Sequence, residues 1–206
     1  MEIRYKQASR IFGKQVVFQN LDLHIKSGSK WAILGANGSG KSTLLKCSYG
    51  ALSLSSGEIQ HKHSAKDLNL IEAAKRIGYS APYFELIEEL PALELLQTLA
   101  RFRPWRKDWS AQEILKACLL EDSKNKLVSD FSSGMKQRLR LGVALAAETD
   151  LIILDEPSSN LDRQGLKWYQ DFLEAHLDGR TLIVGTNYSD EEAFLCEHQL
   201  RISDYQ

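Results

Sequence analysis

Residues 35–43 decide the fold, and they read Gly35-Ala36-Asn37-Gly38-Ser39-Gly40-Lys41-Ser42-Thr43. This segment fits every position of the phosphate-binding pattern G-x-x-x-x-G-K-[ST], and it directly follows the apolar run Trp31–Leu34. Glycines let successive backbone N–H groups of such a loop point inward, and the helix that follows adds a partial positive charge. A strand, this loop and a helix therefore predict an α/β fold that binds a nucleotide triphosphate.

Two side chains of the loop extend this prediction. We expect the Lys41 ammonium to lie near the outer phosphates and the Ser42 hydroxyl to complete the coordination of a Mg²⁺ ion that bridges them. A glycine-serine turn before a helix can fit the pattern by chance. The strand before this loop and the helix after it argue against that alternative.

Composition indicates one soluble α/β domain over residues 1–206, because 43% of the residues are apolar, 26% are charged and no Pro/Gly/Ser-rich linker interrupts the chain. The net charge of −1 argues against a nucleic-acid partner. The three cysteines are far apart, which suggests neither a disulfide framework nor a zinc site. No apolar stretch approaches the roughly 18 residues that cross a bilayer. We therefore expect a cytoplasmic protein that reaches the membrane only through a partner.

Hydrophobic periodicity divides the chain into three parts. The first 30 residues alternate apolar and polar side chains around a turn at Gly13-Lys14, which predicts antiparallel strands, and a hairpin at Ser55–Gly57 is expected to lead into a strand over 58–63. Residues 76–79 predict another strand. Helical spacing over 88–120, with Pro91 near a helix start, predicts a small helical subdomain inserted at about 84–130.

Strands and helices alternate again after Asp130. Helices are expected over about 135–147 and 166–176, and the apolar runs 151–154 and 181–184 indicate strands buried on both faces. The predicted fold class is therefore α/β, with a P-loop NTPase core built on a mostly parallel sheet, an N-terminal antiparallel β subdomain and a small helical subdomain.

Two carboxylates, Asp155 and Glu156, directly follow the apolar run 151–154. They are expected at the carboxyl edge of the sheet, where α/β proteins bind ligands. Asp155 is suited to hold Mg²⁺, directly or through water, and Glu156 to orient or deprotonate an attacking water. An ordinary acidic turn is the alternative, and the phosphate loop makes it less favoured.

A family resemblance follows from Phe131-Ser132-Ser133-Gly134-Met135 and from Ser159-Asn160-Leu161-Asp162. With the phosphate loop and the Asp-Glu strand, their order and spacing resemble those of ATP-binding cassette (ABC) ATPases over nearly the whole chain. Phe131–Met135 resembles the LSGGQ signature, with Ser132 and Gly134 matched and three positions changed. Residues 159–162 resemble the D-loop.

The resemblance implies that two cassettes sandwich two ATP molecules, with Ser132 and Gly134 of one chain facing the phosphates of the other. The sequence itself leaves open whether these residues act within one chain or across two. Phe12 matches the family aromatic that stacks on adenine, although a buried hairpin phenylalanine is an alternative.

Two positions depart from the family pattern. The glutamine expected after the strand 76–79 is replaced by Pro82, and the switch histidine is replaced by Asn187. Proline offers no donor, and the asparagine amide is shorter than imidazole and stays neutral. We therefore expect slow ATP hydrolysis, with Glu156, Lys41 and Asn187 as the catalytic residues.

The resemblance thus implies an ATP-binding and ATP-hydrolysing subunit that powers a separate membrane permease at the inner face of the membrane, paired with a second cassette that is expected to be another copy. A regulatory cassette with negligible hydrolysis is the alternative from another class, whereas a P-loop kinase would leave the signature and the D-loop unexplained. The resemblance also suggests that the helical insertion receives a coupling helix of the permease, although its aromatic residues could simply pack. These aromatic residues are Tyr83, Phe84, Phe102, Trp105 and Trp109.

Overall fold

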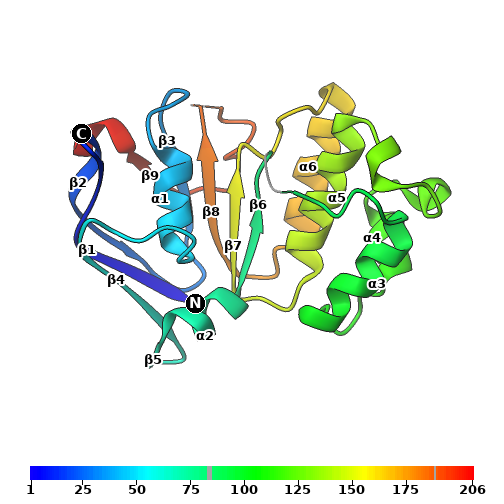
Figure 1. Cartoon of the computed structure of the whole chain (residues 1–206), viewed down its shortest axis with the longest axis horizontal. Coiled ribbons are helices and arrows are strands. Elements are labelled where there is room, and N and C mark those ends of the chain that lie inside the picture. The colour runs from blue at the N-terminus through cyan, green and yellow to red at the C-terminus, as the bar shows by residue number, and fades with distance from the viewer. Residues whose placement is uncertain (83–84, 188) are drawn as a thin grey trace.

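The computed structural model describes residues 1–82, 85–187 and 189–206, and its strands form two sheets (Figure 1). The antiparallel sheet has the order β2-β1-β4-β5, and the parallel sheet has the order β6-β7-β8-β3-β9. The strands of the antiparallel sheet are β1 (Glu2–Phe12), β2 (Gln15–Ile25), β4 (Ser56–His63) and β5 (Lys66–Leu68). Those of the parallel sheet are β3 (Lys30–Leu34), β6 (Ile77–Ser80), β7 (Leu151–Asp155), β8 (Thr181–Thr186) and β9 (His198–Arg201). The α/β class and the antiparallel β subdomain are confirmed.

Helices cover the parallel sheet on both faces. The α-helices are α1 (Lys41–Ser48), α2 (Leu70–Lys75), α3 (Ala92–Phe102), α4 (Ala111–Ala117), α5 (Ser133–Ala146) and α6 (Arg163–His176). The described residues also form the short 3₁₀ helices η1 (Glu121–Ser123), η2 (Val128–Asp130) and η3 (Ile202–Tyr205). None of the helices in the described part of the chain is long and apolar enough to span a bilayer.

The packing of strand β7 on both of its faces explains why the apolar run 151–154 is continuous. Residues Leu151 and Ile153 of this strand pack in a core with α1 and the antiparallel sheet, whereas Ile152 and Leu154 pack in a core with α5 and α6. Alternate side chains of a strand point to opposite faces, so a strand covered on both faces needs apolar residues at every position. The carboxyl ends of these strands thus meet at one edge, beside the start of α1 (Figure 1).

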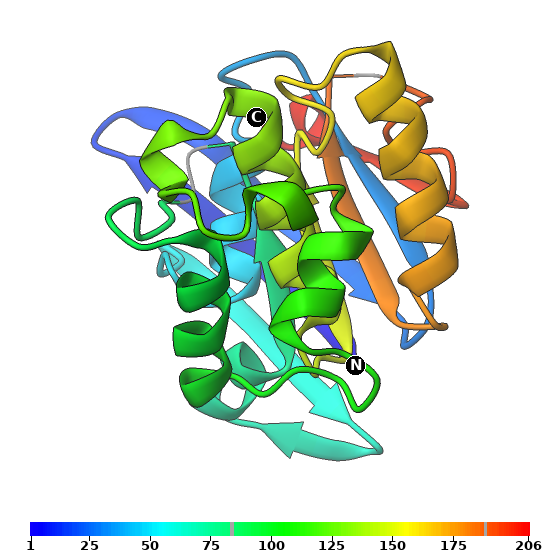
Figure 2. The same ribbon diagram turned by 90° about the vertical axis from the view of Figure 1, so that its right-hand side faces the viewer.

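Helices α3 and α4 with η1 and η2 lie between β6 and α5 in the chain, and α3, α4 and η2 share a third core with α5. Figure 2 shows α3, α4, α5 and α6 together on one side of the molecule. Ser110 and Glu113 form a capping box that starts α4, and Pro91 is the N-cap of α3. The helical spacing after residue 88 therefore corresponds to real helices.

The hairpin expected at Ser55–Gly57 is wrong. Strand β4 begins at Ser56 and pairs with β1, and the hairpin of this region joins β4 to β5 instead. Gly57 has φ 79°, and a Cβ there would lie 2.2 Å from the carbonyl oxygen of Gln7. The glycine that suggested a turn therefore allows a close approach of two strands.

Candidate nucleotide-binding site

The phosphate loop joins the end of β3 to the start of α1. Gly40 has φ 102°, and a Cβ at this position would lie 2.3 Å from Cγ1 of Val17 in β2. Among the described residues no side chain caps α1, so the first N–H groups of the helix face the loop without a side-chain acceptor. Such N–H groups and the helix dipole favour an anion at this position.

Lys41 is the buried cation of the loop, with a relative exposure of 3%. Its Nζ donates to the carbonyl oxygens of Gly35 at 2.8 Å and Ala36 at 3.2 Å, and it also donates to Oδ1 of Asn187. The Nδ2 of Asn187 in turn donates to Oδ1 of Asn37. The position that replaces the switch histidine is therefore tied to the phosphate loop at two points.

Glu156 meets the same ammonium from the end of β7, with Oε1 3.5 Å from Nζ of Lys41. It has φ 46°, a left-handed conformation that costs a non-glycine residue on the order of 1–3 kcal/mol. The Glu156 N–H donates to the carbonyl oxygen of Gly185 at 2.8 Å, and Nε2 of Gln137 in α5 donates to the carbonyl oxygen of Pro157 at 2.9 Å. The turn after β7 is thus held from both β8 and α5.

Asp155 is buried, and its Oδ1 has no hydrogen-bond partner among the described residues. Burial raises the pKa of this carboxyl, whereas a hydrogen bond with the Ser42 side chain lowers it. A carboxylate oxygen without a partner beside a serine hydroxyl is a donor set that fits Mg²⁺, which prefers oxygen ligands and usually keeps several waters. The described residues hold no group of three or more His, Cys, Asp or Glu side chains suited to a metal. One carboxylate and one hydroxyl therefore suit an ion that the nucleotide itself helps to hold.

A cavity of about 250 Å³ opens beside the loop, and Phe12, Glu156 and Gln206 line it together with Gly38–Thr43. Phe12 is 46% exposed, so the alternative of a buried hairpin phenylalanine does not describe it. The guanidinium carbon of Arg10 lies 4.2 Å from the centroid of the Phe12 ring. The structure thus brings the aromatic side chain and the phosphate loop to one cavity.

The matched signature residues lie elsewhere. Ser132 is the N-cap of α5, where its Oγ accepts from the Met135 N–H at 3.2 Å, and Ser132 and Gly134 line a second cavity of about 410 Å³ with Asn160 and Asp162. The two cavities share no lining residue. Within one chain, the structure therefore does not bring Ser132 and Gly134 to the phosphate loop.

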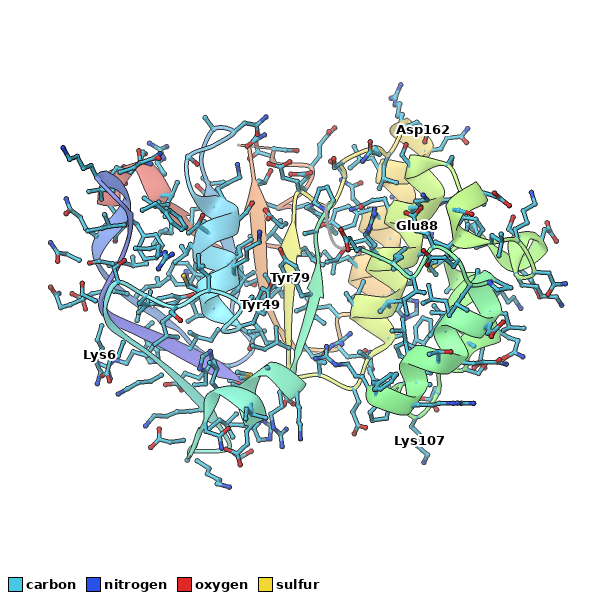
Figure 3. All side chains as sticks on the ribbon, in the orientation of Figure 1. Lys6, Tyr49, Tyr79, Glu88, Lys107 and Asp162 are labelled. Atoms are coloured by element: carbon cyan, nitrogen blue, oxygen red, sulfur yellow. The ribbon has the colours of Figure 1, made fainter. Side chains whose placement is uncertain are left out.

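A third cavity of about 420 Å³, the aromatic groove, lies between α1, β6 and α3. It is lined by Tyr49, Ala74, Ile77, Tyr79, Leu99, Phe102, Arg103, Trp105, Val143 and Ala144. The rings of Tyr49 and Tyr79 meet with centroids 4.5 Å apart (Figure 3), and Phe102 is 84% exposed. Trp109 instead packs against Phe172, with ring centroids 6.3 Å apart. Tyr83 and Phe84 lie outside the described residues.

Sequence reasoning missed three residues around this site. Gln137 holds the turn after β7, Nε2 of Gln206 donates to the carbonyl oxygen of Ser39 at 2.9 Å, and Glu192 is buried beside the same turn. None belongs to a pattern by which residue type and spacing alone would have revealed its contact. Pro82, by contrast, follows β6 and lines neither the nucleotide cavity nor the signature cavity.

The parallel sheet, the phosphate loop and the buried aspartate at the end of β7 define a P-loop nucleotide-binding protein. Residues 18–159 match the family model described as ABC transporter. This match covers more than half of the chain, which therefore belongs to the ABC transporter family and is its ATP-binding cassette.

Two curated relatives and one solved structure place the chain within this family. The chain is 28% identical over 200 residues to the Nod factor export ATP-binding protein I of Cupriavidus metallidurans, covering 95% of this chain and 66% of that one. It is 30% identical over 205 residues to the glycine betaine uptake system ATP-binding protein YehX of Escherichia coli, with the same two coverages. The chain thus spans just under two thirds of the length of these relatives.

The solved structure is the dimeric post-hydrolysis state of the ATP-binding cassette MJ0796 bound to ADP and Pi, which is 26% identical with a TM-score of 0.82. The superposition covers 97% of this chain and 93% of that chain.

Proposed function

We propose that the chain binds and hydrolyses ATP and powers a separate membrane permease through ATP-driven dimerisation. The observation that carries this proposal is the convergence of Lys41, Glu156 and Asn187 on the phosphate loop. A carboxylate for the attacking water and a neutral amide donor thus each contact the cation that would bind the phosphates. Membership of the ABC ATPase family supports the same function.

The residues divide the work by their chemistry. The main chain of 35–43 cradles the phosphates, Lys41 neutralises the outer ones, and Phe12 stacks on the adenine ring. Ser42 and Asp155 would hold Mg²⁺, which supplies charge neutralisation to the phosphates. Glu156 orients the attacking water and accepts its proton.

Slow turnover follows from the two departures from the family pattern. Pro82 replaces an amide-bearing glutamine, and Asn187 supplies a neutral donor in place of histidine. Loss of one preorganised donor typically costs about 3–4 kcal/mol of transition-state stabilisation, or roughly 10²–10³ in rate. Because Glu156 and the magnesium ligands are retained, hydrolysis is reduced and not abolished.

A second copy of the chain would complete the site. Ser132 and Gly134 line a cavity that is separate from the phosphate loop of their own chain, so the Ser132 hydroxyl, which can still donate, and the Gly134 N–H would face a nucleotide held by another chain. The dimer named for MJ0796 supports an arrangement of two cassettes. ATP would close this pair and hydrolysis would reopen it.

The aromatic groove is the docking site that suits a short helix of the permease. Exposed Phe102 and the paired rings of Tyr49 and Tyr79 offer an apolar surface that a partner helix can bury. In this arrangement the chain is cytoplasmic and lies at the inner face of the membrane through the permease.

Two observations favour a second candidate function, a regulatory cassette that dimerises on ATP and hydrolyses it negligibly. These are the absence of a side-chain amide at Pro82 and the replacement of histidine by Asn187. The two functions differ in one measurable quantity, which is steady-state phosphate release by the purified chain with Mg-ATP.

Phosphate release that exceeds the rate of the Glu156→Gln variant supports hydrolysis, and a further increase when the co-purifying permease is added supports coupling to transport. Phosphate release equal to that of the variant, combined with ATP-dependent dimerisation in analytical ultracentrifugation, supports the regulatory function instead.

A further inference from the structure

Glu192 is a buried carboxylate in the segment that follows β8, with a relative exposure of 6%. Its Oε1 accepts from the N–H of Ser158 at 3.0 Å and from Oγ of Ser158 at 2.5 Å, and its Oε2 accepts from Oγ1 of Thr186. Both carboxylate oxygens are therefore occupied by donors from two separate segments. A buried carboxylate with such complete hydrogen bonding is costly to disturb.

These two segments carry Glu156 and Asn187, the two groups that the proposed function places at the γ-phosphate. Ser158 is two residues after Glu156, and Thr186 is the residue before Asn187. Thr186 Oγ1 also accepts from the Ser189 N–H at 3.3 Å, so this hydroxyl both donates to Glu192 and accepts from the loop. One carboxylate thus connects the turn after β7 to the end of β8.

The turn after β7 needs such support, because Glu156 has a left-handed backbone that surroundings must impose on a non-glycine residue. The main-chain bond between Glu156 and Gly185 fixes the start of the turn, and the bonds from Ser158 to Glu192 fix its end. Gln137 also holds this turn through the carbonyl oxygen of Pro157. Loss of the Glu192 bonds would therefore loosen the end of the turn relative to Asn187 without releasing the whole turn.

We infer that Glu192 is a positioning residue whose carboxylate holds the Glu156 turn and the Asn187 strand end in register around the γ-phosphate. The inference rests on the proposed function, since the rate it controls is that of ATP hydrolysis. It also predicts a preference for ATP over ADP that does not depend on turnover, because the neutral amide of Asn187 would donate to the γ-phosphate, which only ATP has.

The test measures kcat and KM for Mg-ATP and the dissociation constants of ATP and ADP. The measured number of nucleotide sites per chain gives the concentration of active protein from which kcat is calculated. Glu192→Ala is expected to lower kcat by about 10–100-fold with KM changed less than about threefold, because a small misplacement of reacting groups acts on the transition state. The same misplacement is expected to lower the preference of Glu192→Ala for ATP over ADP. Glu192→Gln keeps an acceptor for Ser158 and a polar partner for Thr186, so it should restore most of kcat.

Tyr169→Phe is the matched control, because the Tyr169 hydroxyl donates to the main-chain oxygen of Glu192 at 2.8 Å and leaves the carboxylate bonds intact. This variant should lose stability but keep kcat. Should Glu192→Ala fail to fold, Thr186→Val removes the hydroxyl donor without removing the side-chain volume, and the same fall in kcat and in ATP preference is expected.

A wild-type protein that releases no phosphate contradicts only the proposed function. The dissociation constants of ATP and ADP still test the inference about Glu192. The inference is overturned when Glu192→Ala, or Thr186→Val in its place, keeps the wild-type preference for ATP over ADP and, where the wild type hydrolyses ATP, the wild-type kcat. It is also overturned when Tyr169→Phe lowers kcat as much as Glu192→Ala, since the effect is then general loss of packing.

Discussion

The substitution Glu156→Gln should change hydrolysis and binding in opposite directions. Removing the carboxylate removes the group that accepts a proton from water, a contribution that is typically worth about 10²–10⁴ in kcat. The same carboxylate lies 3.5 Å from the ammonium of Lys41 and competes with phosphate for it. Glutamine has the same size and no charge, so it removes both effects without leaving a cavity.

The gain in binding can be worked from this contact. Two unit charges 3.5 Å apart interact by about 5 kcal/mol at an effective dielectric constant of about 20. The Glu156 side chain is 32% exposed, and solvent screening reduces the net effect to about 1 kcal/mol. The dissociation constant of Mg-ATP is therefore expected to fall by about fivefold.

Single-turnover phosphate release and calorimetric titration with Mg-ATP measure these two quantities. The exposed residue Glu191 offers a matched control, because Glu191→Gln makes the same chemical change outside the site and should alter neither. A Glu156→Gln variant with unchanged phosphate release would refute the assignment of Glu156 as the base, and weaker ATP binding would refute the competition for Lys41.

Three further predictions concern other groups of the structure. Asn187→His should raise kcat by about tenfold near neutral pH, because the longer imidazole side chain carries an N–H donor that reaches further than the asparagine amide; a kcat equal to that of the wild type would contradict this. Burial raises the pKa of the Asp155 carboxyl, so this carboxyl is protonated at a pH above the ordinary range of aspartate. Mg-ATP binding should weaken as the pH falls through that range, and this pH dependence should disappear in Asp155→Asn. Mg-ATP affinities that change with pH in the same way in both proteins would argue against the magnesium role of Asp155. Arg180 is buried and donates to main-chain oxygens at the ends of α5 and α6, including that of Leu145 at 3.0 Å. Its pKa is lowered to about 10, mainly by burial, so it stays charged at neutral pH. Arg180→Met should lower the free energy of unfolding in urea by about 3–5 kcal/mol, and a loss below about 1 kcal/mol would contradict the role of Arg180 in holding the ends of these helices.

The sequence allowed the phosphate loop, the Asp-Glu strand and the fold class to be predicted because each depends on neighbouring residues. Periodicity identifies a strand such as 151–154 from its own side chains, and the positions of Asp155 and Glu156 follow from where that strand ends. The same local logic failed at Ser55–Gly57. There the glycine allows a close approach to Gln7, fifty residues earlier in β1, and no local pattern encodes that pairing.

Contacts between distant segments were likewise not predictable. The bridge from Asn187 to Asn37 joins residues 150 positions apart, and the bonds from Glu192 to Ser158 join residues 34 positions apart. Trp105 and Trp109 looked alike in the sequence, yet the first lines the aromatic groove and the second packs against α6. Only the arrangement of α3, α5 and α6 separates these two tryptophans.

We propose that a main-chain loop and one buried ammonium hold the phosphates of ATP. Calorimetric titration of the wild type, Lys41→Ala and the control Lys116→Ala with Mg-ATP tests it most directly, because Lys116 is an exposed cation on α4 that does not line the nucleotide cavity. Loss of a charged hydrogen bond worth about 3 kcal/mol predicts that Lys41→Ala binds roughly 100-fold more weakly, whereas Lys116→Ala binds like the wild type. Equal affinity in all three proteins, or no binding to the wild type, would contradict the account.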